Sequence, residues 1–171
     1  MTSTATGNQS GALGTSLLFD VFALDQAVGG LLADAMGDGP LRPSEYAVYS
    51  AIFELEAASP TALAARLGMR LTTFIDQLRR VQGRGHARRI GNPGDRRSYR
   101  VVLTNAGLEA HRAANRQFEE AQRGFVTALA GLEPATREAL RAMRAAADSA
   151  RSMRAAGATG ATPRPLAGRA G

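Results

Sequence analysis

The sequence predicts a mainly α-helical chain with one small β-hairpin, and three observations support that prediction. Apolar residues recur at three- and four-residue spacing over most of the chain, which is the period of amphipathic helices. Glycine and proline clusters separate these periodic segments. One stretch, residues 87–103, instead places short apolar alternations on either side of a turn, as the two strands of a hairpin do.

The composition of the 171 residues excludes several classes of protein. Hydrophobic residues make up 44% and aromatic residues 5%, so we expect a core of Ala, Leu and Val with few large side chains. The chain has no cysteine, which excludes a disulfide, a thiolate metal site and a thiol redox sensor. The two histidines, His86 and His111, lack the spacing of a zinc site, so we expect no metal and no cofactor.

The amino-terminal residues 1–12 are small and polar and have no basic segment ahead of an apolar run. They predict a disordered arm rather than a signal peptide. No run of about 18 apolar residues exists to span a membrane. We therefore expect a cytoplasmic protein that does not enter a membrane.

The first predicted helix covers residues 13–36 and would be roughly 36 Å long. Phe19 and Phe22 widen its apolar stripe beyond what one core needs, which predicts contacts on two sides. Residues 1–42 contain four Asp and one Arg, so this end should face away from a phosphate backbone. The other apolar positions of the stripe are Leu17, Leu18, Val21, Leu24, Val28, Leu31, Leu32 and Ala35.

Two helices with proline at their first turn follow. Pro43 suits the start of a helix over residues 43–57, because proline lacks the N–H that a first turn leaves unpaired. Ser59 can serve as the N-cap and Pro60 as the first residue of a helix over 60–67.

The next helix covers residues 71–83 and begins after a tight turn at Gly68, which ends the helix before it. Its apolar positions share one face, so the opposite face is free to contact another molecule. The helices over 60–67 and 71–83 predict a helix-turn-helix. The apolar face consists of Leu71, Phe74, Ile75, Leu78 and Val81.

A hairpin completes this domain. Residues 87–90 predict a short strand, residues 92–95 a turn, and the alternation of Tyr99, Val101 and Leu103 a returning strand. Helix, strand, turn and strand in this order predict a winged helix-turn-helix domain over residues 40–104.

Positive charge is concentrated between Arg66 and Arg100, where ten arginines and two aspartates give a net charge of +8 against +6 for the whole chain. A solvated basic face would explain arginine in place of lysine, which the chain lacks, but not this concentration. We therefore expect contact with double-stranded DNA. Arg96 and Arg97 at the end of the hairpin can bind phosphates or enter a minor groove. Asp95 can structure this wing by pairing with one arginine and accepting backbone N–H bonds.

In a helix-turn-helix the amino-terminal residues of the second helix meet base edges. Thr can touch a thymine methyl, Gln suits adenine, and Arg suits guanine or a phosphate. Asp76 would repel phosphate, but it could accept a hydrogen bond from cytosine or pair with an arginine three or four residues on. The predicted DNA-binding residues are Arg70, Thr72, Thr73 and Gln77, with Arg79 and Arg80 one turn further along.

Two long helices close the chain. Thr104 can cap one that runs to about residue 130, and Pro134 opens another that runs to residue 154. Their apolar stripes, with that of residues 13–36, predict that 13–36 and 105–154 are dimerisation helices of a homodimer. An intramolecular bundle is the alternative, although these helices carry more apolar surface than one core covers. Residues 155–171 predict a disordered tail.

Several segments resemble the MarR family of dimeric winged-helix transcription regulators, over roughly residues 13–153. The most specific of them is Asp95-Arg96-Arg97 followed by Leu-Thr-x-x-Gly. The sequence departs from the family at His86, where an aliphatic residue is usual and where we expect a half-buried structural histidine. The segments are Ser59–Met69, Thr72–Thr73, Leu78–Gly85, Asn92–Ser98 and Val102–Gly107.

This resemblance implies a repressor that binds an inverted-repeat operator as a homodimer. A dimer would place its reading helices about 34 Å apart, so half-site centres should be roughly ten base pairs apart. The resemblance also implies a small aromatic or phenolic effector that binds between the dimer helices and the winged domain and relieves repression. The side chains that could line such a cleft are Phe19, Phe22, Tyr46, Tyr49, Phe53 and His111.

A second hypothesis is that the scaffold has lost DNA binding and acts as a small-molecule-binding protein or as an enzyme on a small hydrophobic substrate. Asp76 on the reading helix, Arg70 in place of the family's Ser-type N-cap, and the tyrosines of residues 43–57 motivate it. Against it, no nucleophile–base pair or carboxylate pair stands at a convincing spacing, so no catalytic residue is expected.

Overall fold

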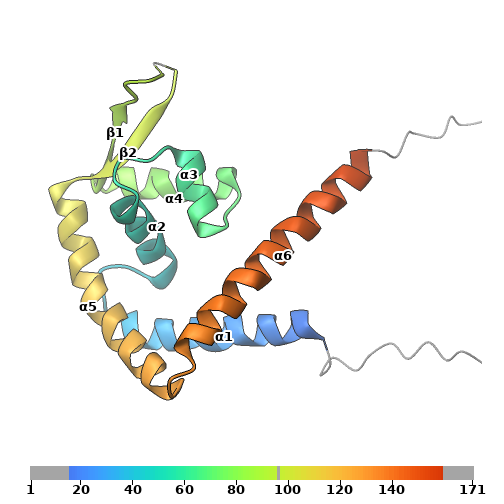
Figure 1. Ribbon diagram of the computed structural model, residues 1–171. Helices are drawn as coiled ribbons and strands as arrows, with labels where there is room; N and C mark the ends of the chain where they lie inside the picture. The colour runs from blue at the N-terminus through green and yellow to red at the C-terminus, as the bar shows by residue number, and fades with distance from the viewer. Residues whose placement is uncertain (1–15, 96, 160–171) are drawn as a thin grey trace, which may run out of the picture. The chain divides into compact units, whose positions relative to one another are not determined.

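The computed structural model of the protein describes residues 16–95 and 97–159, and these residues form six helices and one two-stranded antiparallel hairpin (Figure 1). This agrees with the predicted fold class. The predicted arm over residues 1–12, Arg96, and residues 160–171 of the predicted tail lie outside the described residues. The elements are α1 (Leu17–Met36), α2 (Pro43–Glu54), α3 (Pro60–Leu67), α4 (Leu71–Gly83), β1 (Ala87–Gly91), β2 (Tyr99–Leu103), α5 (Asn105–Ala128) and α6 (Glu133–Thr159).

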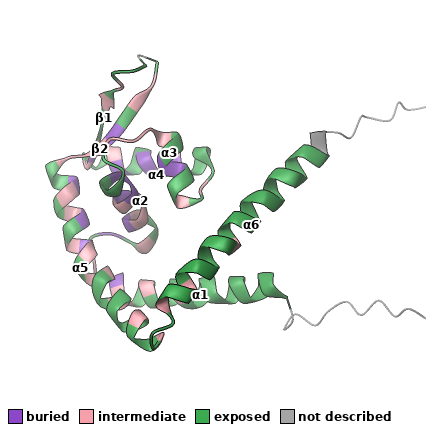
Figure 2. Ribbon diagram, in the orientation of Figure 1, coloured by how far each residue is buried: buried purple, intermediate pink, exposed green. Residues whose placement is uncertain are grey.

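The chain divides into two compact units, residues 1–123 and 124–171, and α5 passes from one into the other. The core of the first unit lies around α2, and Figure 2 shows buried residues on α2, α3, α4 and the base of the hairpin. The apolar face predicted for α4 faces this core, because Phe74, Leu78 and Val81 are buried. The core residues are Met36, Leu41, Tyr46, Val48, Tyr49, Ala51, Ile52, Leu63, Ala64, Phe74, Leu78, Val81, Ala87, Val101 and Ala114.

The signals that start and end α3 act as the sequence predicts. The Ser59 hydroxyl accepts a hydrogen bond from the backbone N–H of Ala62 at 3.2 Å, and Pro60 follows as the first helical residue. Gly68 adopts a left-handed conformation (φ 67°), which a residue with a side chain rarely does, and turns the chain toward α4. These local features fix the helix-turn-helix.

The predicted end of α2 at residue 57 was wrong, because the helix ends at Glu54. Glu56 and Ala57 have positive φ values of 36° and 66°, which a right-handed helix cannot contain. This bend brings the carbonyl of Ala58 to the hairpin, where it accepts a hydrogen bond from the Val101 N–H at 3.0 Å. A contact distant in the sequence thus ends the helix before its apolar pattern does.

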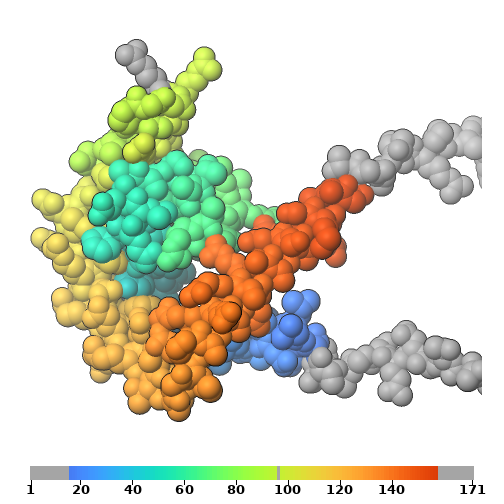
Figure 3. Space-filling model, viewed as in Figure 1, coloured from blue at the N-terminus to red at the C-terminus, as the bar shows by residue number. Residues whose placement is uncertain are grey.

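The hairpin stands out from the body formed by α2, α3 and α4 (Figures 1 and 3). Its strands pair antiparallel, with Ala87 opposite Leu103 at the base and Gly91 opposite Tyr99 near the tip. At the turn, a side-chain oxygen of Asp95 accepts a hydrogen bond from the Arg97 backbone N–H at 2.9 Å. This bond is of the kind that the sequence predicts for Asp95 within the wing.

Thr104 and Gly107 join the base of the hairpin to α5. The Thr104 N–H donates to the His86 carbonyl at 3.0 Å, and its hydroxyl donates to the Gly85 carbonyl at 2.8 Å while accepting from the Gly107 N–H at 3.2 Å. Gly107 is buried, and a Cβ atom there would lie 2.0 Å from the His86 carbonyl oxygen. The Leu-Thr-x-x-Gly motif is thus a joint that only glycine fits at its last position.

The helix α1 is largely exposed in this single chain. Its carboxyl end packs on the first unit through buried Met36, with Leu32 and Ala35 half-buried, whereas Leu18 and Phe22 are 79% and 59% exposed. Across residues 16–95 and 97–159, none of the helices is both long and apolar enough to cross a bilayer.

The helix α6 belongs to the second unit and continues through Thr159. The prediction that residues 155–159 belong to a disordered tail was therefore wrong. Residues 155–158 are Ala-Ala-Gly-Ala, and alanine is the best helix former, so the helix continues past its last apolar stripe position.

Candidate nucleic-acid interface and pocket

The exposed face of α4 carries most of the predicted DNA-contacting residues. Thr72, Thr73, Arg79 and Arg80 are exposed and Gln77 is half-buried. Thr72, Thr73, Arg79 and Arg80 point away from the buried residues of the same helix, as the predicted amphipathic pattern requires, and Gln77 lies at the edge of the buried face. The structure therefore places these side chains on one solvent-facing surface.

Two charged residues shape this surface. Arg70 occupies the N-cap position of α4 and is exposed, and its side chain makes no capping hydrogen bond. Asp76 accepts a hydrogen bond from the Arg79 guanidinium at 2.8 Å, an ion pair three residues apart. Of the two arginines that the sequence allowed as ion-pair partners of Asp76, the structure shows Arg79.

The wing adds further arginines. Arg97 is exposed on the turn that Asp95 holds, while Arg96 lies outside the described residues. On the strands, the Arg89 guanidinium lies over the ring of Tyr99, 4.4 Å from its centroid. This cation–π contact holds the guanidinium at the side of the hairpin. Arg89 is not among the residues that the sequence predicts to contact DNA, although the strand register places it diagonally across from the Tyr99 ring.

Two polar contacts anchor α4 and the wing to α2 from behind. Arg84, which follows α4, pairs with Glu45 at 2.7 Å. Burial raises the pKa of the Glu45 carboxyl, but the Arg84 hydrogen bond and the Arg42 backbone N–H outweigh it and lower that pKa below its usual range. The Tyr49 hydroxyl and His86 Nδ1 are 2.9 Å apart, and His86 is half-buried, as predicted for a structural histidine.

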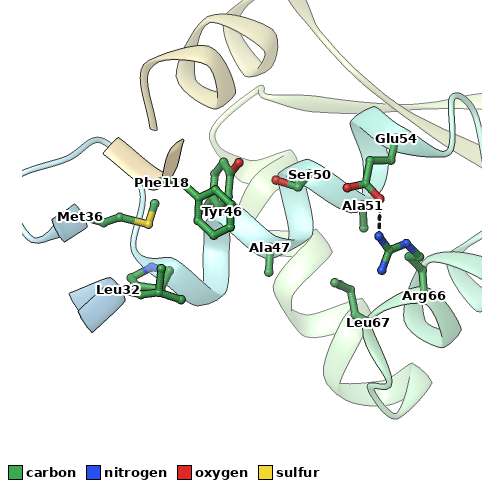
Figure 4. A pocket seen from close by; sticks show the side chains of 11 residues that line it. Leu32, Met36, Tyr46, Ala47, Ser50, Ala51, Glu54, Arg66, Leu67 and Phe118 are labelled. Atoms are coloured by element: carbon green, nitrogen blue, oxygen red, sulfur yellow. Dashed lines mark hydrogen bonds and ion pairs between the residues drawn. The ribbon is translucent and has the colours of Figure 1, made fainter. Parts of the chain in front are cut away.

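A cavity of about 240 Å³ opens beside α2 within the first unit (Figure 4). Apolar side chains from α1, α2, α3 and α5 form most of its wall. Glu54 and Arg66 form an ion pair of 2.7 Å at one end, and Ser50 contributes a hydroxyl between that pair and the ring of Tyr46 (Figure 4). The lining residues are Leu32, Met36, Pro43, Tyr46, Ala47, Ser50, Ala51, Glu54, Arg66, Leu67 and Phe118.

Tyr46 is the one residue of the six predicted for an effector cleft that lines this cavity. Its hydroxyl donates to Asn115 Oδ1 on α5 at 2.5 Å, and its ring centroid lies 4.8 Å from that of Phe118. Tyr49 is fully buried in the core behind it. Phe19 and Phe22 lie exposed on the amino-terminal half of α1.

His111 is buried beside the cavity rather than in its wall. Its Nε2 lies 3.1 Å from the Ser50 hydroxyl, and its ring stacks on Tyr46 with 5.4 Å between centroids. Burial, which disfavours the charged ring, lowers the pKa of His111.

Phe53 also contacts the His111 ring, with 4.8 Å between ring centroids, and is 49% exposed. It lines a second, more open hollow of about 420 Å³ where α2, β2 and the start of α5 meet. The lining residues are Ile52, Phe53, Glu56, Ala57, Val102, Leu103 and Leu108.

Solved structures that are similar to this chain include transcriptional regulators. The PcaV transcriptional regulator from Streptomyces coelicolor, in complex with its natural ligand, shares 26% sequence identity and a TM-score of 0.67, covering 82% of this chain and 98% of PcaV. The transcriptional repressor CouR, bound to a 23-mer DNA duplex, is 24% identical to this chain with a TM-score of 0.65. The match covers 84% of this chain and 99% of CouR. MarR from E. coli, in its apo form, is 22% identical to this chain with a TM-score of 0.60. The match covers 75% of this chain and 96% of MarR.

This chain is a winged-helix protein of the MarR type. No family model matches its sequence, and no curated protein sequence matches it. Because the identity to CouR and to MarR is below 25%, the likeness to those two proteins shows the fold.

In this MarR-type chain, the predicted DNA-binding residues of α4 lie together, whereas the residues predicted for an effector cleft divide among the cavity, the core and the exposed part of α1. The sequence does not predict the Glu54–Arg66 and Glu45–Arg84 ion pairs, whose partners are 12 and 39 residues apart. No local signal identifies such partners. Among residues 16–95 and 97–159, no group of three or more His, Cys, Asp or Glu side chains is placed to hold a metal ion.

Proposed function

We propose that the protein is a DNA-binding transcriptional regulator that acts as a repressor, binds an inverted-repeat operator as a homodimer, and responds to a small aromatic or phenolic ligand. The observation that carries this proposal is the surface of α4, whose exposed face gathers threonines and arginines in the most basic part of the chain. Similarity to a repressor bound to a DNA duplex supports it.

On DNA, the first turns of α4 would enter the major groove. Arg70, Thr72, Thr73 and Gln77 are the side chains that would meet base edges or the nearest phosphates. The hairpin, with Arg97 at its turn, would follow the backbone into the adjacent minor groove. Because arginines supply most of these contacts, affinity should fall steeply with salt concentration.

A homodimer would cover the apolar residues that one chain leaves exposed. The helix α1 exposes apolar side chains on most of its surface, which is typical of a helix that is buried in an assembly. A two-fold dimer would present two α4 helices to successive major grooves, about 34 Å apart. Within residues 16–36 and 105–154, the large apolar residues that are exposed are Leu17, Leu18, Phe19, Val21, Phe22, Leu24 and Leu31 on α1, Phe125 on α5, Leu132 between α5 and α6, and Leu140 and Met153 on α6.

The cavity beside α2 is the site that we propose for the effector. A volume of about 240 Å³ suits a small molecule, and the wall combines aromatic side chains with a few polar groups, as ligand sites do. Because α3 contributes Arg66 and Leu67 to the wall, a ligand there would contact the helix-turn-helix itself. The similar regulator PcaV was crystallised with its natural ligand.

A gel-shift experiment at two salt concentrations tests the DNA-binding part of the proposal. The probes are the DNA upstream of the protein's own gene and of neighbouring genes, with random DNA as competitor. The variant Arg96→Ala/Arg97→Ala should lose binding, whereas Arg112→Ala/Arg116→Ala, which removes two exposed arginines from α5, should retain it. Wild-type binding no tighter than binding to random DNA would refute the proposal and favour a role in small-molecule binding.

A further inference from the structure

Asp76 stands at the centre of the exposed face of α4. Successive residues of an α-helix are rotated by about 100°, so Asp76 points roughly 160° away from buried Phe74 and Leu78. Thr72 lies one turn before it on the same face, and the Asp76 side chain is 65% exposed. Any duplex that contacts Thr72 and Thr73 would also meet this carboxylate.

The carboxylate has no structural task that would explain this position. Its single partner within residues 16–95 and 97–159 is Arg79, and that ion pair is exposed on both sides, so it contributes little to helix stability. The other acid of the basic segment, Asp95, differs in this respect because it closes the turn of the wing. Asp76 therefore places a negative charge where DNA would bind, with one guanidinium beside it.

The chemistry of a carboxylate restricts what Asp76 can meet on DNA. An ionised carboxylate only accepts hydrogen bonds, so it is repelled by phosphate oxygens and by the acceptor atoms of guanine and thymine. In the major groove, cytosine presents an amino donor and no acceptor of its own, whereas adenine carries the acceptor N7 beside its amino group. Arg79 offsets the charge of Asp76 at 2.8 Å and has further N–H donors that fit the guanine of the same base pair.

We propose that Asp76 determines base specificity by accepting a hydrogen bond from a cytosine in each half-site, with Arg79 as the group that positions its carboxylate. This inference rests on the proposed function, because it applies only if α4 reads DNA. It assigns a role to the residue that otherwise weakens the DNA-binding surface, and it predicts one C·G base pair at a fixed place in each half of the operator.

The test begins with selection of binding sites from random duplexes by the wild-type protein. Affinities are then measured for the selected operator and for the same operator in which the predicted C·G base pair is changed to T·A in both halves. The variants are Asp76→Ala and, as a matched control, Asp148→Ala. Asp148 forms an i,i+3 pair with Arg151 on α6, with side-chain exposures of 62% and 63% that resemble those of Asp76 and Arg79.

The deciding quantity is the ratio of the two affinities within each protein, which a general change in folding or charge leaves unchanged. We expect wild type and Asp148→Ala to prefer the C·G operator by roughly 5- to 150-fold per half-site, and Asp76→Ala to lose that preference. If the affinity ratio of Asp76→Ala equals that of wild type, the inference is wrong. In that case, tighter binding of both operators by the same factor would show that Asp76 only repels phosphate. A wild-type protein that selects no sequence refutes the proposed function itself.

Discussion

Replacing Gly107 with alanine should strongly destabilise the winged unit. A Cβ atom at this position would lie 2.0 Å from the carbonyl oxygen, 2.9 Å from the carbonyl carbon and 3.2 Å from the Cα atom of His86, all of them backbone atoms. Relief of this overlap requires the start of α5 and the base of the wing to separate by more than an ångström. No flexible side chain can move aside instead.

The cost follows from the contacts at this joint. Separation would weaken the two hydrogen bonds from Thr104 to His86 and Gly85, each of which contributes about 1 kcal/mol. Overpacking of a tight contact adds about 1–3 kcal/mol, and the helix propensity of alanine returns less than about 1 kcal/mol. We expect a net loss of about 3 kcal/mol and a fall in Tm of roughly 10 °C.

Urea unfolding followed by circular dichroism measures this loss, with Gly124→Ala as the matched control. Gly124 lies in the same helix, and a Cβ atom there would meet nothing within 4 Å. The control should be as stable as wild type or more stable by up to about 1 kcal/mol. Equal stabilities of the two variants would refute the close approach of α5 to His86.

Three further predictions concern single side chains. Ser59→Ala should lower the free energy of unfolding by about 1 kcal/mol, measured by urea titration, because α3 loses its N-cap hydrogen bond; an unchanged midpoint would contradict that role. Tyr99→Leu should weaken DNA binding in gel shifts more than Tyr99→Phe, because phenylalanine keeps a ring beneath the Arg89 guanidinium; equal affinities would show that the contact is unimportant for binding. The pKa of His111 is lowered in the folded state, so the unfolded state takes up a proton at this histidine first as pH falls. The contribution of His111 to stability is therefore complete above about pH 6.5 and decreases below that pH. Unfolding measured between pH 7.5 and 5 should therefore depend less on pH in His111→Gln than in wild type, and parallel curves would exclude this histidine as a cause.

The parts of the fold that the sequence predicted well are those set by neighbouring residues. Ser59, Pro60 and Gly68 act within one turn of their own positions, so the bounds of α3 and the start of α4 follow from local rules. The end of α2 depends instead on the pairing of Ala58 with Val101, and no pattern within residues 43–57 indicates that contact.

The candidate site shows the same division. The reading face of α4 follows from its own period, because the buried residues define the opposite side. The lining of the cavity does not follow from the period of α2, since Tyr46 and Tyr49 are three residues apart on that helix and equally aromatic. Only the packing of α5 and α1 decides that Tyr46 faces the cavity and Tyr49 the core. Ion pairs such as Glu54–Arg66 depend on tertiary geometry in the same way.

The contacts of α2 also suggest an order of events during synthesis. Tyr49 bonds to His86, 37 residues along the chain, whereas Tyr46 bonds to Asn115 and Ser50 to His111, separated by 69 and 61 residues. Contacts between residues close in sequence form faster, because less loop-closure entropy is lost. At translation rates of about 5–20 residues per second, Asn115 follows Thr104 by on the order of a second. The helix-turn-helix and the wing can therefore assemble on the ribosome before α5 arrives to close the cavity.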